Sequence, residues 1–215
     1  MIDPEKDRRH PIVPARTAML FFDCLAGYLH PRDAAAAAEV VGSGIIQRLV
    51  RIERACREAG IAIVYAQADH RPDWKDVQRY VADAPTRSRP PGPHVFEHPG
   101  VASGDPRAEV IDEIAPRPGD YVIKKHRWSA FFGTHLELSL RSAGIDTLML
   151  AGGAIEVGIA STAYAARDLG FSQVVLRDAC RSTRPGMREA FMDTIFPNFA
   201  RVRTVEEAIA LFARP

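Results

Sequence analysis

The chain has 215 residues, of which 28 are Lys or Arg and 27 are Asp or Glu, so its formal net charge is +1. This length suits one α/β domain spanning residues 1–215, since no low-complexity linker divides the sequence. The balanced charge, with no concentrated basic stripe, argues against a nucleic-acid partner. No apolar run approaches the roughly 18 residues that span a membrane, and the start lacks a secretion signal, so we expect no membrane association.

The chain contains three cysteines, Cys24, Cys56 and Cys180, and none belongs to a CxxC pair. Their spacing does not indicate a disulfide framework. A reducing, cytoplasmic environment is therefore the simpler expectation.

Short apolar runs alternate with segments of helical periodicity along the chain, which is typical of parallel βαβ units. The sequence therefore predicts an α/β fold. The candidate strands are Thr17–Phe22, Ile61–Ala66, Tyr121–Lys124, Thr147–Ala151 and Gln173–Arg177, with a short sixth strand near Arg201–Arg203.

Three helices are indicated between these strands. The first is marked by an apolar face and by Gly60, which serves as a stop signal. The other two precede the fourth and fifth strands and end near Gly144 and Gly170. Their apolar positions are Ile45, Leu49, Ile52 and Cys56 in the first, Leu136 and Leu140 in the second, and Ile159, Ala163 and Ala166 in the third.

Residues 83–106 are rich in Pro, Gly and Arg, and they predict a long loop over one rim of the sheet. Loops of this kind on a rigid scaffold often close over a ligand. The lone histidines His94 and His98 lie in this segment, and we expect them to be exposed rather than catalytic.

Polar groups follow most of the predicted strands. Because ligands of open α/β sheets bind outside the carboxyl ends of the strands, these groups are expected to converge on one edge. They are Asp23, the pair Asp69 and His70, Lys125, the turn from Gly152 to Gly158, and Asp178.

Asp23 follows the apolar run "AMLFF", so its carboxylate is expected at the boundary of the core. Burial raises the pKa of a carboxyl group and a nearby ammonium lowers it, so such a pair can be poised for proton transfer. Lys125 is the natural partner, although a surface lysine at a strand end is an equal alternative. Lys124 should point the other way by strand alternation.

The run "KKHRWSAFFGT" from Lys124 to Thr134 combines basic groups with three aromatic side chains. Trp128, Phe131 and Phe132 could line a pocket for a small molecule. The alternative for Phe131 or Phe132 is an ordinary place in the core.

The stretch "QADHRPD" contains two potential metal ligands, Asp69 and His70. Neighbouring side chains on a strand diverge, and no second histidine follows at ligand spacing. The sequence therefore predicts neither a metal site nor a cofactor.

A nucleophile is hard to find from the residues alone. There is no GxSxG motif, Cys24 should point away from Asp23, and Cys180 reads as a buried thiol that is nevertheless the hardest to dismiss.

Four blocks carry a family likeness: "AMLFFD", "KHRWSAFFGTHLELSLRSAGIDTLMLAGG", "EVGIASTAYAARDLGF" and "VVLRDAC". Together they closely resemble the isochorismatase-like hydrolase superfamily, from Thr17 to about Cys180. The resemblance implies a three-layer α/β/α sandwich with a six-stranded, mainly parallel, Rossmann-like sheet. It also implies a homodimer or homotetramer that acts on a small-molecule substrate.

Most members of this superfamily are cysteine hydrolases that cleave amide bonds with an Asp, a Lys and a Cys. By resemblance, Asp23 and Lys125 match the first two, whereas the Cys position falls on Gly158. The resemblance also implies a cis peptide bond between Gly153 and Ala154. The substrate-binding positions that we expect are Tyr28, Trp128, Gly153, Ala154 and Ile155.

Isochorismatases resemble this chain in having Gly at the same position, and they hydrolyse a vinyl ether without a covalent intermediate. On that model Asp23 is a general acid, Lys125 positions it, and Gly158 leaves room for the substrate. Leu25 and Ile155 differ from the usual residues, which argues against isochorismate itself. Glu156 could activate water, but subunit contacts or hydrogen bonds within the turn are the favoured role.

The leading hypothesis is therefore a hydrolase of a small metabolite that uses Asp23 as a general acid. The alternatives are amide hydrolysis by water or by a displaced thiol such as Cys180, and a catalytically silent protein that binds a ligand.

Overall fold

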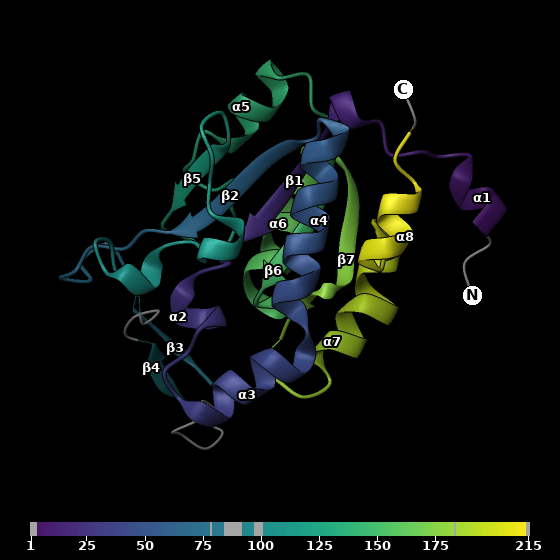
Figure 1. Ribbon diagram of the computed structural model, residues 1–215. Coiled ribbons are helices and arrows are strands. Elements are labelled where there is room, and N and C mark those ends of the chain that lie inside the picture. The colour runs from purple at the N-terminus through teal and green to yellow at the C-terminus, as the bar shows by residue number, and fades with distance from the viewer. Residues whose placement is uncertain (1–3, 78, 84–91, 97–100, 183, 214–215) are drawn as a thin grey trace.

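The computed structural model describes residues 4–77, 79–83, 92–96, 101–182 and 184–213. A six-stranded sheet forms the centre of the molecule, in the order β5-β2-β1-β6-β7-β8, and each neighbouring pair is parallel (Figure 1). All six predicted strands are present, with ends that differ by a few residues. They are β1 (Thr17–Phe22), β2 (Ala62–Ala68), β5 (Tyr121–Lys125), β6 (Thr147–Gly153), β7 (Ser172–Arg181) and β8 (Arg201–Arg203).

Helices cover both faces of the sheet, which confirms the predicted α/β/α layers. In Figure 1, α4 and α8 lie in front of the sheet and α6 lies behind it. The α-helices are α1 (Pro4–Arg8), α2 (Ala26–Leu29), α3 (Ala34–Ser43), α4 (Ile45–Ala59), α5 (Leu136–Ser142), α6 (Ala160–Asp168), α7 (Met187–Glu189) and α8 (Val205–Ala210). Shorter 3-10 or π turns are η1 (Pro14–Arg16), η2 (Pro106–Ala108), η3 (Asp112–Ile114), η4 (Ile155–Ile159), η5 (Ala190–Ile195) and η6 (Phe196–Asn198).

Two hydrophobic cores follow from this layering, one on each face. The first contains Leu49, Ile52 and Cys56 of α4, and the second contains Leu136 of α5 and Ala163 of α6. The sheet separates the two cores, and β1 contributes side chains to both. All six residues of β1 are buried, as its apolar sequence predicts for a parallel strand. In the part of the chain that the structure describes, no helix is long and apolar enough to cross a membrane.

Helix α4 shows how the local sequence sets an element's end. Gly60 adopts a left-handed conformation with φ of 73°, and its N–H donates to the carbonyl groups of Cys56 and Arg57. Glycine adopts this conformation without a steric penalty, so the helix stops there and β2 begins two residues later. The predicted stop signal is confirmed.

The predicted long loop of residues 83–106 is corrected in part. Residues 94–96 form β4 (His94–Phe96), which pairs antiparallel with β3 (Tyr80–Ala82) in a separate two-stranded sheet. Strands this short carry little periodic signal, so the Pro- and Gly-rich composition concealed them. His98 lies outside the described residues.

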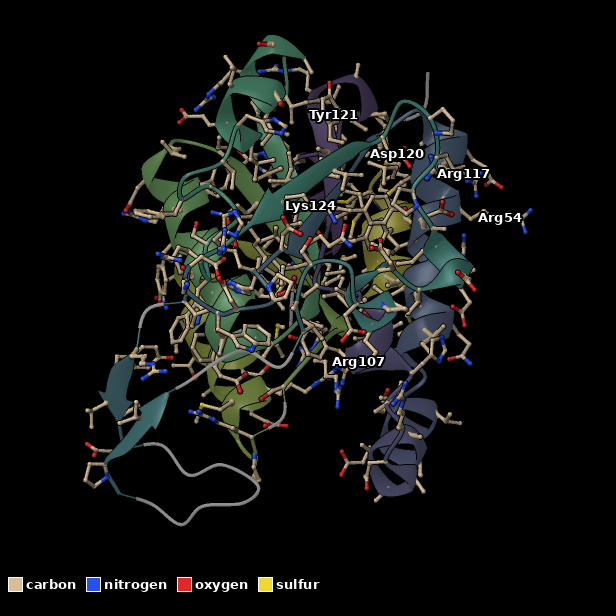
Figure 2. The ribbon with its side chains drawn as sticks, turned by 90° about the vertical axis from the view of Figure 1, so that its left-hand side faces the viewer. Arg54, Arg107, Arg117, Asp120, Tyr121 and Lys124 are labelled. Atoms are coloured by element: carbon tan, nitrogen blue, oxygen red, sulfur yellow. The ribbon has the colours of Figure 1, made fainter. Side chains whose placement is uncertain are left out.

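The edge strand β5 is fastened to α4 at its beginning. The Arg57 guanidinium donates to both carboxylate oxygens of Asp120, at 3.0 and 2.7 Å, and also pairs with the buried Glu53. Figure 2 shows Asp120 at the start of β5 and Lys124 toward its other end. This ion-pair network sets the position from which β5 runs toward the carboxyl edge of the sheet.

The strand order reverses at β1, because the chain first builds β2 and β5 on one side and then crosses to β6 on the other. Ligands of open α/β sheets bind in the crevice at such a reversal. The residues that follow β1 and β6 are Asp23 and the turn that begins with Ala154.

Candidate functional site

Asp23 begins the site, directly after β1. Its φ of 46° is unusual for a residue with a side chain, and its N–H donates to the Ala66 carbonyl at 2.9 Å. One carboxylate oxygen, Oδ1, accepts a hydrogen bond from the Ala68 N–H at 2.9 Å. The end of β2 therefore holds the Asp23 carboxylate in one orientation.

Lys125 reaches Asp23 from the edge strand β5, across the end of β2. Its Nζ lies 2.8 Å from Oδ2 of Asp23, and the two side chains are 5% and 12% exposed. Lys124 is exposed, as strand alternation predicts. The sequence-based expectation that Asp23 and Lys125 lie together is therefore confirmed, and the alternative of a surface lysine is wrong.

Burial has a direct effect on the Asp23 carboxyl group. Desolvation raises the pKa of Asp23 above its ordinary value, and the Lys125 ammonium and the Ala68 N–H oppose this without cancelling it. A carboxyl group in this environment is easier to protonate than one in water, which is what proton donation requires.

Phe22 joins this pair to the turn after β6. The Lys125 Nζ lies over the Phe22 ring, 4.2 Å from its centroid. The same ring lies against Gly158, where an added Cβ would overlap with ring carbons of Phe22. The Phe22 ring therefore fills the space that a side chain at position 158 would need.

The turn itself contains the predicted cis peptide bond between Gly153 and Ala154, which is confirmed. Gly152 has a φ of 115°, and a Cβ there would overlap with the Phe22 carbonyl, so only glycine fits. Gly153 and Ala154 are partly exposed, whereas the Ile155 side chain is fully buried in the second core. The Ile155 side chain therefore presents no surface to a ligand.

Tyr28 lies on α2, close enough to Asp23 for the two to interact electrostatically. Burial raises the pKa of Tyr28, and the Asp23 charge raises it further, so the phenol stays protonated. A protonated hydroxyl group can donate a hydrogen bond to an anionic or carbonyl oxygen.

The aromatic run after β5 divides between surface and core. Trp128 is half exposed and meets the Tyr80 ring of β3 edge to face, at 6.5 Å between centroids. Phe131 packs against the second core, whereas Phe132 is 68% exposed. The core alternative thus fits Phe131 and is wrong for Phe132.

Asp178 does not join the site, although it was expected at the same edge. Its carboxylate accepts a hydrogen bond from the Val205 N–H at 2.9 Å and pairs with Arg48 at 3.3 Å. β7 is irregular opposite β6 and continues past Asp178 to Arg181, so this residue fastens α8 and α4 to the sheet.

The three cysteines are all free and buried. Burial raises the pKa of Cys180 to about 12 and raises the pKa values of Cys24 and Cys56 as well. Since the thiolate is the nucleophile, these environments argue against a displaced thiol.

Glu156 lies in the turn after β6, on η4. Its Oε2 is buried and has no hydrogen-bond partner among the described residues. This oxygen therefore does not support the expectation that Glu156 forms hydrogen bonds within the turn.

A further cluster lies beside the pair, and the sequence indicated only one of its members, His70. His70 follows β2, His126 follows β5, and Asp76 lies between their imidazole rings. Burial lowers the pKa of His70 below its ordinary value, although Asp76 opposes this. The one sequence clue to the cluster was that His126 directly follows Lys125. The two histidines are separated by 55 residues in the sequence, and the pairing of β2 with β5 brings them together.

The model of the isochorismatase domain matches residues 17–207. This chain belongs to the isochorismatase family. Among curated relatives, the isochorismatase family protein YwoC of Bacillus subtilis is 44% identical over 100 residues, which cover 46% of this chain and 53% of that protein. The chain thus aligns with about half the length of YwoC.

Longer matches cover most of the chain. Maleamate amidohydrolase of Pseudomonas putida is 26% identical, over 90% of this chain and 85% of that protein. The crystal structure of a cysteine hydrolase from Pseudomonas syringae pv. phaseolicola superposes with a TM-score of 0.75 at 25% identity, covering 93% of each chain.

Proposed function

We propose that this isochorismatase-family hydrolase cleaves a small carboxylated or carbonyl-bearing metabolite by general acid catalysis from Asp23, with no covalent enzyme intermediate. The substrate class that suits this chemistry is a vinyl ether. The catalytic group comprises Asp23, Lys125 and Gly158.

One observation carries the proposal: the Phe22 ring occupies the space beside Gly158, next to the Lys125 ammonium. A thiol at position 158 would need that space. The mechanism is therefore one that uses the buried Asp23–Lys125 pair without a nucleophile on the turn.

The reaction has two steps and balances without a cofactor. The Asp23 carboxyl group transfers its proton to the terminal carbon of the enol ether, which leaves an oxocarbenium ion and the Asp23 carboxylate. Water adds to the oxocarbenium carbon, the hemiketal releases the alcohol, and the carbonyl product forms while the carboxyl group regains a proton. Lys125 holds the carboxylate in place and stabilises its charge.

The surrounding residues supply binding contacts. The Tyr28 hydroxyl and Trp128 contact the substrate, and the backbone of the turn from Gly153 to Ile155 donates hydrogen bonds to its anionic oxygen atoms. The partial exposure of Gly153 and Ala154 supports this role.

A second candidate is amide hydrolysis by activated water. The similarity to maleamate amidohydrolase favours it, and the Asp23–Lys125 pair would serve equally well with Asp23 acting as a base. Glu156, with its unpartnered Oε2, is a second carboxylate that could then activate water.

A screen of vinyl ethers, amides and esters with the wild-type protein and Asp23→Asn tests these candidates. We expect turnover of a vinyl ether that Asp23→Asn loses, because an amide cannot donate the proton. Asp178→Asn is the matched control, since Asp178 lies outside the site and should leave turnover intact once the variant is shown to be folded. Retained activity in Asp23→Asn would contradict the proposal, and the absence of any turnover would favour a silent, ligand-binding member.

We also propose that the protein is a cytoplasmic homodimer or homotetramer. The free, buried cysteines support a reducing compartment, and the family resemblance supports assembly. Sedimentation equilibrium should give the mass of two or four chains, and the mass of a single chain would contradict this assembly.

A further inference from the structure

We propose that His70, Asp76 and His126 form a binding site for one divalent transition-metal ion, beside the Asp23–Lys125 pair. The site would supply two imidazole nitrogens and one carboxylate oxygen. This departs from the sequence-based expectation of no metal and does not depend on the reaction proposed above.

The distances between the three side chains are compatible with a shared ion as well as with hydrogen bonds. Oδ2 of Asp76 lies 3.3 Å from Nδ1 of His70 and 3.3 Å from Nδ1 of His126. Hydrogen bonds to nitrogen are usually 2.7–3.2 Å, whereas two ligands at about 2.1 Å from a tetrahedral ion lie about 3.4 Å apart. Each of the three residues offers a ligand atom within 4.8 Å of the others.

The chain around the cluster holds its ligands in place. Oδ1 of Asp76 accepts a hydrogen bond from the Arg71 N–H at 3.1 Å, which directs Oδ2 toward the histidines. The Asp76 carbonyl accepts from Arg127 at 3.0 Å, and the His70 carbonyl accepts from the Ser103 N–H at 2.7 Å. Such outer contacts orient ligands in established metal sites.

Burial and charge are also compatible with an ion. The side chains of His70 and Asp76 are 11% and 19% exposed, whereas that of His126 is 49% exposed and leaves a path from solvent. Of the cations nearby, Lys125 is paired with Asp23, Arg71 is paired with Asp73 at 2.7 Å, and Arg127 donates to the backbone carbonyls of Asp76 and His126. These pairings reduce the repulsion that a dication would meet.

The ligand set indicates the kind of ion and its role. Two histidines and one carboxylate suit Zn²⁺ or Fe²⁺, and three protein ligands leave positions open for water or for an oxygen of the substrate. An ion here would bind a substrate carboxylate or carbonyl group at the edge of the sheet that holds Asp23.

Direct titration tests the site without any need for a substrate. Tag-free protein, stripped with a chelator, is titrated with Zn²⁺ against a chromophoric competitor, and Co²⁺ binding is followed by its visible absorption. We expect one equivalent per chain. His126→Ala and Asp76→Asn should each weaken binding by more than the roughly 10- to 100-fold that loss of an outer contact costs.

His30→Ala is the matched control, because the exposed His30 pairs with Glu113 at 3.0 Å and the described residues offer it no third ligand. It should bind Zn²⁺ like the wild type. Asp76→Asn keeps the shape of the side chain, so loss of binding in a folded variant reports the ligand itself. Absence of stoichiometric binding, or equal affinity in His126→Ala and His30→Ala, would overturn the proposal.

Discussion

Phe22 is the residue that most distinguishes the chemistry of this site. The Lys125 ammonium lies over the Phe22 ring, and the same ring occupies the space that a side chain at Gly158 would need. In the sequence Phe22 looked like one more buried residue of β1, because a strand pattern reports burial and not which atoms meet. The contact between the large Phe22 side chain and Gly158 is visible only in the folded structure.

Gly158→Cys should therefore destabilise the protein. The added side chain overlaps with the Phe22 ring, and overpacking of this kind costs about 1–3 kcal/mol of unfolding free energy, measured by urea denaturation. Phe22→Val combined with Gly158→Cys should recover most of that loss. Gly42→Cys is the control, since a Cβ at Gly42 meets nothing within 4 Å. A Gly158→Cys variant as stable as the wild type would contradict the packing argument.

The pH dependence of turnover should follow the Asp23 carboxyl group. Desolvation raises the pKa of Asp23 above its ordinary value, although the Lys125 ammonium opposes this. A general acid must be protonated, so kcat/KM should be highest at low pH and fall as the pH rises through this pKa. A profile that rises through the same pKa would indicate a base, as amide hydrolysis by activated water requires.

Asp23 and Lys125 lie together because neighbouring parallel strands end at the same edge of the sheet. β1 and β5 carry Asp23 and Lys125 to the same edge with β2 between them, and the 2.8 Å contact depends on the position of β5. β5 is an edge strand, so its place depends on the ion pairs at its start as well as on its pairing with β2.

Removing Arg57 should accordingly be costly. Arg57→Ala leaves the buried carboxylates of Glu53 and Asp120 without their main partner, and breaking such a buried pair costs about 3 kcal/mol of unfolding free energy. Arg54→Ala, on the exposed face of the same helix, should change stability little. Figure 2 shows Arg54 and Asp120 in the same view. Equal effects of the two substitutions in urea denaturation would contradict the role given to Arg57.

At the scale of the whole molecule, the layered fold was predictable and the finer contacts were not. Short apolar runs located all six strands of the central sheet, and Asp23 and Lys125 were found because each stands at the end of a predicted strand. The β3–β4 hairpin and the cluster of His70, Asp76 and His126 depend on contacts between distant segments, which periodicity does not encode. That residues 1–215 act as one domain stays a prediction.

The cysteines should report global unfolding. All three are buried and their pKa values are raised, so the native protein should resist a thiol reagent, and three thiols should react after denaturation. Loss of activity on rapid alkylation of Cys180 in the native protein would revive the displaced-thiol mechanism.

The most direct test of the central claim is hydrolysis of the vinyl-ether substrate in D₂O, with the products followed by mass spectrometry at short times. If Asp23 protonates carbon, the carbonyl product carries one deuterium on the former enol-ether carbon, and folded Asp23→Asn forms no product. Turnover by Asp23→Asn, or a covalent adduct on the protein during turnover, would contradict the account.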